Sequence, residues 1–104
     1  ESWHDPQGRL VWVNDAVQRM TGYRVEECLQ MRDYPLPIVS PSDQPRMKKM
    51  LEAAIDRQSH NDLEFQIVTR DGETRCMAVS WQPMYHDDGT HLGFRTSVRD
   101  ITDR

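Results

Sequence analysis

Acidic side chains that stand next to each other are the first residues of this chain that could do chemistry. Glu26 with Glu27, and Asp33 with Tyr34, have the residue types of an acid–base couple. Catalysis needs a base or nucleophile together with a partner that orients it, whereas neighbouring acids are more often the solvated turn of a helix. The sequence also lacks a glycine-rich phosphate loop, a His-Glu metal motif and a serine elbow. It therefore predicts a non-catalytic domain.

Cysteine and histidine could instead bind a metal or form a disulfide. Cys28 and Cys76 are too few and too far apart for a zinc site or a disulfide scaffold, so we expect free thiols in a reducing compartment. The four histidines stand near predicted turns or strand ends, without acids or cysteines at metal-ligand spacing. They are His4, His60, His86 and His91. The residue types predict no metal centre.

Length and charge set the class of protein. The chain has 104 residues, 37% of them hydrophobic and 29% charged, and a net charge of −4, which fits one domain with one core. Acids and bases are interspersed, so we expect no nucleic-acid partner and no direct membrane contact. The longest apolar stretches span only a few residues, so we expect no membrane helix or signal peptide within the chain. We expect a cytoplasmic domain, although its parent protein could be membrane-anchored.

The first half of the chain predicts two short strands followed by short helices. Asp5-Pro6-Gln7-Gly8 has the residues of a tight turn, between a stub of strand over 1–4 and a strand over 9–14. Short helices are predicted from about 15 to 20 and from 25 to 31. Glu26 and Glu27 suit the first turn of the second helix.

A longer helix is predicted to begin at Ser40 or Ser42, with Pro45 in its first turn. Its apolar residues recur at helical spacing and form one stripe. They are Met47, Met50, Leu51, Ala54 and Ile55. This stripe predicts a helix that packs one face on a sheet.

The remaining sequence alternates as strands do. Leu63, Phe65 and Ile67 share one face of a predicted strand, and two further strands follow hairpin turns at Asp71-Gly72 and Asp88-Gly89. Two strands, several helices and three strands predict an α+β fold. In it, a five-stranded antiparallel sheet carries the short helices and one longer helix on a single face.

This order of elements and motifs resembles the PAS fold over essentially the whole chain, as a single domain covering 1–104. Each motif is weak alone, and the order and spacing make the set specific. The residues that carry the resemblance are Asp5, Gly8-Arg9-Leu10, Val13-Asn14, Thr21-Gly22-Tyr23, Glu26-Glu27, Pro41-Ser42-Asp43, Arg70-Asp71-Gly72, Asp88-Gly89 and Asp100-Ile101-Thr102.

The resemblance is to the bacterial sensory-box modules that precede histidine kinases of two-component phosphorelays, GGDEF-type diguanylate cyclases and phosphodiesterases. It implies a sensory and dimerisation module that shares its chain with an effector, a histidine kinase first and a cyclic-di-GMP enzyme second. Residues 100–104 would begin the signalling linker, in which Asp100 and Thr102 bond backbone at the strand exit and cap an outgoing helix. The simpler alternative is that Thr102 only caps a helix. The competing function is a protein-interaction adaptor with a filled core.

The resemblance also implies a ligand site between the inner sheet face and the helices. The flavin photoreceptor branch needs a cysteine where this chain has Asp33, and a glutamine where it has Val98. Haem-binding members usually supply a histidine from the long helix, and residues 43–58 contain none. The sequence therefore argues against covalent flavin and against haem. The remaining alternatives for this site are a small organic ligand and an empty, packed core.

The inner sheet face and the helices predict the residues that would line such a pocket. Trp81 would fill much of it, and its indole N–H would need a partner, for which Thr96 is the candidate. The predicted lining is Met31, Ile38, Met47, Met50, Leu51, Phe65, Met77, Val79, Trp81, Phe94, Thr96 and Val98.

The outer sheet face carries small uncharged residues that invite packing. It is predicted to consist of Trp12, Cys76, Ala78 and Ser80. In the family, an N-terminal helix or a second copy covers this face, which predicts a homodimer. Coverage by a neighbouring domain of the same chain is the alternative.

Overall fold

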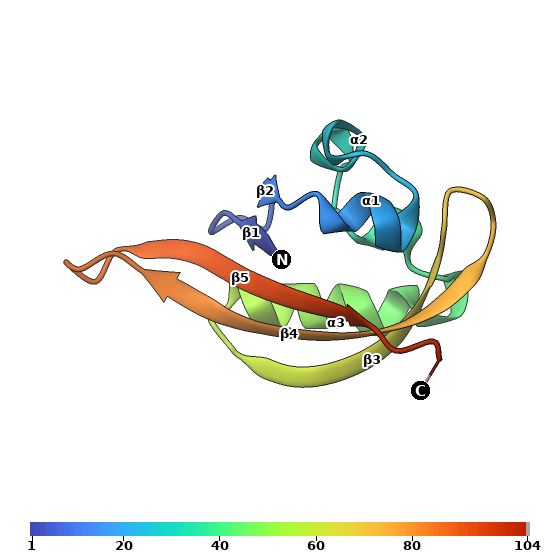
Figure 1. Ribbon diagram of the computed structural model, residues 1–104. Coiled ribbons are helices and arrows are strands. Elements are labelled where there is room, and N and C mark those ends of the chain that lie inside the picture. Colours follow the sequence, from blue (N-terminus) through green and yellow to red (C-terminus); the bar gives the residue numbers. More distant parts are fainter. Residues whose placement is uncertain (104) are drawn as a thin grey trace.

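The computed structural model describes residues 1–103 and shows a curved antiparallel sheet of five strands (Figure 1). The strand order is β2-β1-β5-β4-β3, and every neighbouring pair is antiparallel. The strands are β1 (Ser2–His4), β2 (Leu10–Val13), β3 (His60–Val68), β4 (Thr74–Tyr85) and β5 (His91–Asp100). The strand carrying the predicted linker therefore lies at the centre of the sheet.

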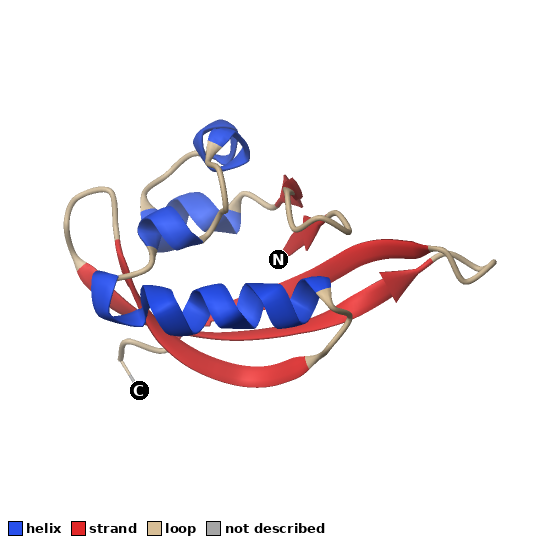
Figure 2. Cartoon of the chain, turned by 180° about the vertical axis from the view of Figure 1, so that it is seen from behind, coloured by secondary structure: helices blue, strands red, loops and turns tan. Residues whose placement is uncertain are grey.

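The helices all lie on one side of this sheet (Figure 2). They are α1 (Ala16–Thr21), α2 (Val25–Gln30), the 3-10 turns η1 (Leu36–Ile38) and η2 (Pro41–Asp43), and α3 (Gln44–Ile55). Within residues 1–103, no helix has the length and apolar character needed to cross a membrane. The predicted α+β architecture is confirmed.

The start of the long helix differs from the prediction. Pro41–Asp43 forms a 3-10 turn, and α3 begins at Gln44 without a side-chain cap from a serine. Asp43 does not cap it either, because its carboxylate accepts the backbone N–H of Gln66 on β3 (2.8 Å) and pairs with Arg46 (3.4 Å). The helix is thus anchored to the sheet at its beginning.

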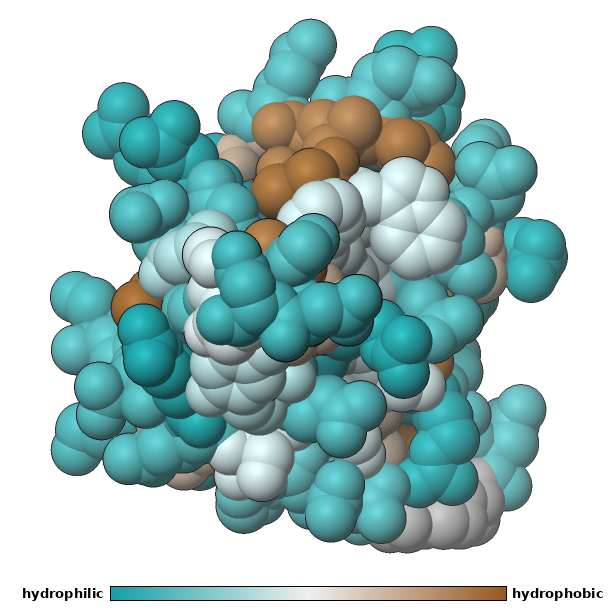
Figure 3. Space-filling view, turned by 90° about the vertical axis from the view of Figure 1, so that its left-hand side faces the viewer, coloured by the Kyte–Doolittle hydropathy of each residue, from teal (hydrophilic) through white to brown (hydrophobic). Residues whose placement is uncertain are grey.

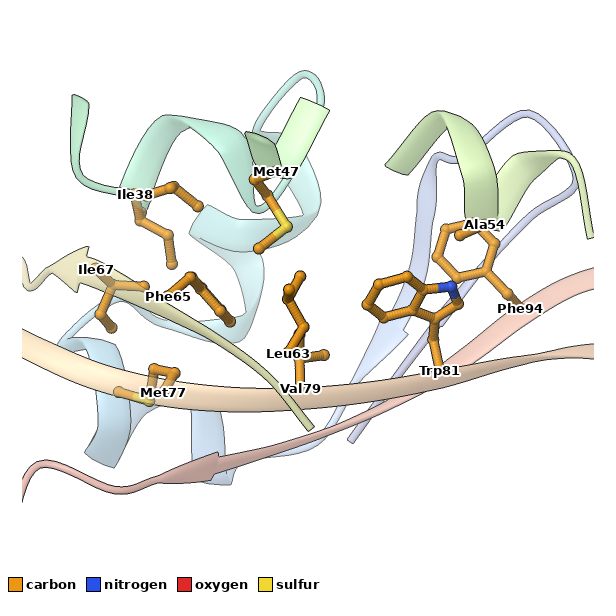
Figure 4. Packing of buried hydrophobic residues seen from close by; sticks show 11 residues of the cluster. Ile38, Met47, Ala54, Leu63, Phe65, Ile67, Met77, Val79, Trp81 and Phe94 are labelled. Atoms are coloured by element: carbon orange, nitrogen blue, oxygen red, sulfur yellow. The ribbon is translucent and has the colours of Figure 1, made fainter. Parts of the chain in front are cut away.

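The core lies between α3 and the inner face of β3, β4 and β5. Side chains that alternate along each strand point inward and pack beneath Met47 and Ala54 of α3 (Figure 4). These buried strand residues are Leu63, Phe65, Ile67, Met77, Val79, Trp81 and Phe94. The period-two pattern of the sequence therefore sets which side chains reach the site.

Candidate functional site

An internal cavity of about 70 Å³ lies between the inner sheet face and the helices. Every residue of the predicted lining borders it except Met31. Met31 ends α2 in an extended conformation and packs, half-buried, on the edge of the core. The cavity residues from the prediction are Ile38, Met47, Met50, Leu51, Phe65, Met77, Val79, Trp81, Phe94, Thr96 and Val98.

The cavity is small because Trp81 occupies the space beside it. The indole is 6% exposed, and its N–H donates to the carbonyl oxygen of Gln58 (3.0 Å), so the predicted partner Thr96 was wrong. Gln58 follows α3 in the chain, and the ring lies below Ala54 at that end of the helix (Figure 4). Thr96 instead bonds the hydroxyl of Ser2.

This volume does not fit the bulky cofactors of the family. Sites for drug-sized ligands measure roughly 300–1,000 Å³, several times the 70 Å³ present here. As packed, the lining leaves no room for a flavin or a haem. His60, the histidine nearest to the end of α3 in the sequence, is exposed on β3 and stacks on Trp81 with ring centroids 5.3 Å apart.

Several polar residues that sequence reasoning missed also line the cavity. Ser2 and His4 come from β1, Thr21 ends α1, and Tyr34 lies in the loop before η1. Strand β1 has only three residues, too few for an alternation pattern to show which side chains point inward. The available signal was that Ser2 and His4 stand two positions apart, which is the spacing of residues on one face of a strand.

Burial favours the neutral form of His4 and Tyr34, which line the cavity, and of Cys28, which is buried outside it. Burial raises the pKa of the Cys28 thiol to about 11, and it also raises the pKa of Tyr34 well above its usual value. Burial lowers the pKa of His4 below 6.5. Because a thiol is nucleophilic only as the thiolate, Cys28 is not poised for chemistry.

The predicted linker residues close against the start of β4. Ile101 donates its N–H to the carbonyl of Cys76 (2.8 Å), and Cys76 donates its own N–H to Oγ1 of Thr102 (3.0 Å). Asp100 accepts the N–H of Thr102 (2.9 Å). These residues therefore continue the β4–β5 ladder through one backbone hydrogen bond and one bond to a side chain.

Arg75 connects this linker to the helical layer. Its guanidinium lies 3.5 Å from Asp100 and also donates to the carbonyls of Arg19 (3.3 Å) and Met20 (3.4 Å) at the end of α1. The hydrogen bond from Thr102 and the charge of Arg75 hold the pKa of Asp100 below its usual value. Because Met20 borders the cavity, a short series of contacts joins cavity and linker.

The outer sheet face is less open than predicted. Ala78 is only 3% exposed, although Trp12 on the same face is 48% exposed. Arg99 on β5 pairs with Asp62 on β3 (2.7 Å), so their ion pair crosses β4. Long charged side chains on the flanking strands can cover small residues on the strand between them. The alternation pattern of β4 alone does not predict this coverage.

Exposed hydrophobic surface also occurs on the end of the molecule seen in Figure 3. There a hydrophobic area is surrounded by polar atoms. Val11 and Trp12 of the edge strand β2 are 43% and 48% exposed, and Leu29 of α2 is 43% exposed. Exposed apolar residues at a sheet edge favour contact with another surface.

Comparison with known proteins agrees with this architecture. A family model described as the PAS fold matches residues 10–97. No match was found among curated proteins.

Solved structures from three signalling contexts superpose on the chain. A sensory box histidine kinase/response regulator from Burkholderia thailandensis has a TM-score of 0.70 and 22% identity, covering 97% of this chain and 75% of that one. The N-terminal domain of a diguanylate cyclase with PAS/PAC sensor from Marinobacter aquaeolei has a TM-score of 0.80 and 14% identity, covering 96% and 93%. The PAS domain of the fruit-fly ELK potassium channel has a TM-score of 0.80 and 18% identity, covering 97% and 85%.

At these identities the superpositions show a shared fold and carry no specific activity. PAS domains are generally non-catalytic sensory modules of signalling proteins, and the matched family model spans most of the sequence. The one-sided helical layer and the antiparallel sheet agree with the matched family model and the superposed structures, and this chain belongs to the PAS family.

Proposed function

We propose that residues 1–104 form one sensory and dimerisation module of a multidomain bacterial signalling protein. The module passes a change in its core through Asp100, Ile101 and Thr102 to an effector in the same chain. Of the possible effectors, a histidine kinase is our first choice, and a diguanylate cyclase or phosphodiesterase is the second. One observation carries this proposal. Arg75 contacts both Asp100 and the end of α1, whose Met20 borders the cavity.

In this proposal, rigid attachment of the linker to the sheet provides the physical route for the signal. Ile101 and Thr102 bond the backbone of Cys76, so the exit of β5 cannot move without disturbing the start of β4. A displacement of α1 changes the carbonyls that Arg75 contacts, and Arg75 then changes its contact with Asp100. Packed elements with two discrete arrangements transmit such shifts.

Replacing Asp100 by alanine in the full-length protein is expected to leave the domain folded and to uncouple effector output from the stimulus. The variant removes the acceptor of the Thr102 N–H and one of the two carboxylates that pair with Arg75, the other being Glu73. Output activity with and without stimulus is the measurement, and the melting temperature of the domain checks folding. Asp103→Ala, an exposed carboxylate three residues on, is the matched control. Normal regulation in Asp100→Ala would contradict the proposal.

The small cavity favours a second candidate function, a protein-interaction adaptor whose core is filled. Native mass spectrometry of freshly purified domain separates the two. A co-purified small molecule, or a melting temperature raised by one member of a metabolite panel, supports ligand sensing. A clean protein mass and unchanged melting across the panel support the adaptor.

We also propose a homodimer through the outer sheet face, centred on Trp12 with Cys76, Ala78 and Ser80. The half-exposed indole of Trp12 supports this surface, because aromatic residues often dominate interface energy. Trp12→Asp is expected to raise the dimer dissociation constant at least about tenfold by analytical ultracentrifugation. Tyr85→Asp, at an equally exposed aromatic position at the end of β4, is the control. An unchanged dimer in Trp12→Asp, or no dimer at all, would count against this face. The predicted cytoplasmic location stays a prediction.

A further inference from the structure

His4 is a titratable group enclosed in the core without a strong hydrogen-bond partner. It is 1% exposed and lines the cavity. Its ring stacks on Phe94 of β5 (centroids 4.6 Å apart, planes 9° apart) and lies 6.2 Å from the ring of Tyr34. Nδ1 is 3.3 Å from the carbonyl oxygen of Gly8, and no bond to Nε2 is found within residues 1–103. A neutral imidazole suits this position.

The charged groups around His4 do little to stabilise a positive ring. Asp5 is the carboxylate whose charge acts on His4, but it already accepts the N–H groups of Gln7 and Arg9 in the β1–β2 turn (2.9 Å each). Glu1 borders the same cavity, and Tyr34 is held neutral by burial. The cavity residues of β2, α1, α3 and β5 are uncharged. They are Val13, Val17, Met20, Thr21, Met47, Met50, Leu51, Ala54, Phe94, Thr96 and Val98.

We propose that this module senses acidification and that His4 is the group that binds the proton, an inference that rests on the sensory function proposed above. The proton comes from solvent and binds the free nitrogen of the imidazole. A charged ring without a carboxylate partner needs water, so protonation favours a conformation in which β1 withdraws from the core.

The position of His4 in the sheet gives this movement a route to the linker. Strand β1 pairs with β5, with His4 opposite Phe94 and Ser2 opposite Thr96. Strand β5 runs on to Asp100 at the linker. Loss of the β1 contacts would therefore first affect β5, the strand that leads to Asp100 and the proposed linker.

The direction of the pH response follows from burial. Desolvation lowers the pKa of His4 below 6.5, opposed by the Gly8 carbonyl and by Asp5. Neutral His4 therefore stabilises the packed state fully above pH 6.5, and this stabilisation is lost as pH falls from 6.5 through the lowered pKa. One proton changes the equilibrium by at most about tenfold per pH unit.

NMR of the domain tests the inference in two ways. The ring signals of His4 should titrate below pH 6.5, whereas His86, an exposed histidine, serves as the internal reference. Amide exchange of Ile101 and Cys76, corrected for intrinsic rates, should rise up to about tenfold per pH unit below 6.5 in the wild type. It should stay flat in His4→Phe, which keeps the stacked ring, and rise as in the wild type in His86→Phe.

Either of two results would overturn the inference. One is a His4 that titrates at or above 6.5 in the wild-type protein, a measurement that needs no variant to fold. The other is an equal acid response in His4→Phe. If either occurs while Asp100→Ala still uncouples output in the full-length protein, only the proton-sensing inference fails. If Asp100→Ala leaves regulation normal, the linker function fails independently of His4.

Discussion

Trp81→Ala is expected to lower the free energy of unfolding of this domain by about 3–5 kcal/mol. The side chain is 6% exposed on the inner face of β4 and lies below α3 (Figure 4). Its removal would enlarge the existing cavity and leave the carbonyl of Gln58 without its indole donor. Urea or guanidinium unfolding, followed by circular dichroism, measures the difference.

A matched control for this variant is Trp12→Ala. Trp12 is the same residue type at a sheet position that is 48% exposed, so its replacement should change stability by no more than about 0.5 kcal/mol in the monomer. If both variants unfold at the same denaturant concentration, Trp81 does not pack as described. Trp81→Phe, which keeps a ring but loses the N–H, should fall between wild type and Trp81→Ala.

Gly93→Ala is expected to destabilise the domain by at least about 3 kcal/mol, and Gly93→Val to prevent folding. Gly93, the third residue of β5, has a φ of +109°. A Cβ there would come within 1.9 Å of the carbonyl oxygen of His4 and 2.8 Å of the carbonyl carbon of Asp5, both backbone atoms that cannot rotate away. Expression yield and thermal unfolding measure this effect.

Gly72→Ala separates steric overlap from backbone strain. Gly72 also has a positive φ, +86°, in the β3–β4 hairpin turn, but a Cβ there would meet nothing within 4 Å. Only the strain of the left-handed conformation, about 1–2 kcal/mol, should remain. A Gly93→Ala protein as stable as Gly72→Ala would show that β1 does not approach β5 as closely as described.

The two residues with large effects constrain the candidate site differently. Trp81 determines the volume left beside it and therefore the size of any ligand. Gly93 allows the backbone of His4 to approach β5, which brings the imidazole onto Phe94. A replacement at Trp81 that enlarges the cavity without unfolding the domain would make the core accessible to larger molecules. Replacement at Gly93 would disturb the proposed proton-sensing contact.

Local sequence patterns were sufficient for the elements and the class of fold. Leu63, Phe65 and Ile67 alternate with polar residues, and the structure buries all three on one face of β3. Asp71-Gly72 and Asp88-Gly89 form the predicted hairpins because glycine takes positive φ there at little cost. Such patterns express constraints on neighbouring residues, and they hold wherever the chain folds into regular elements.

Those local patterns did not predict contacts between segments that are far apart in the sequence. Trp81 bonds Gln58 instead of Thr96, and Ala78 is covered by an ion pair between the strands on either side of it. Met31 follows the last residue of α2 and lies outside the cavity. Each outcome depends on how one helix or strand is placed against another. A pattern of neighbouring residues does not encode that placement.

The sequence by itself determined a one-layer sheet with helices on a single face and the inward set of strand side chains. Tertiary structure alone decided how much space remains inside, which backbone carbonyl receives each buried N–H, and that His4 is enclosed. The physical reason is that periodicity assigns a side chain to a face, whereas cavity volume and polar partners depend on atoms brought together from separate elements.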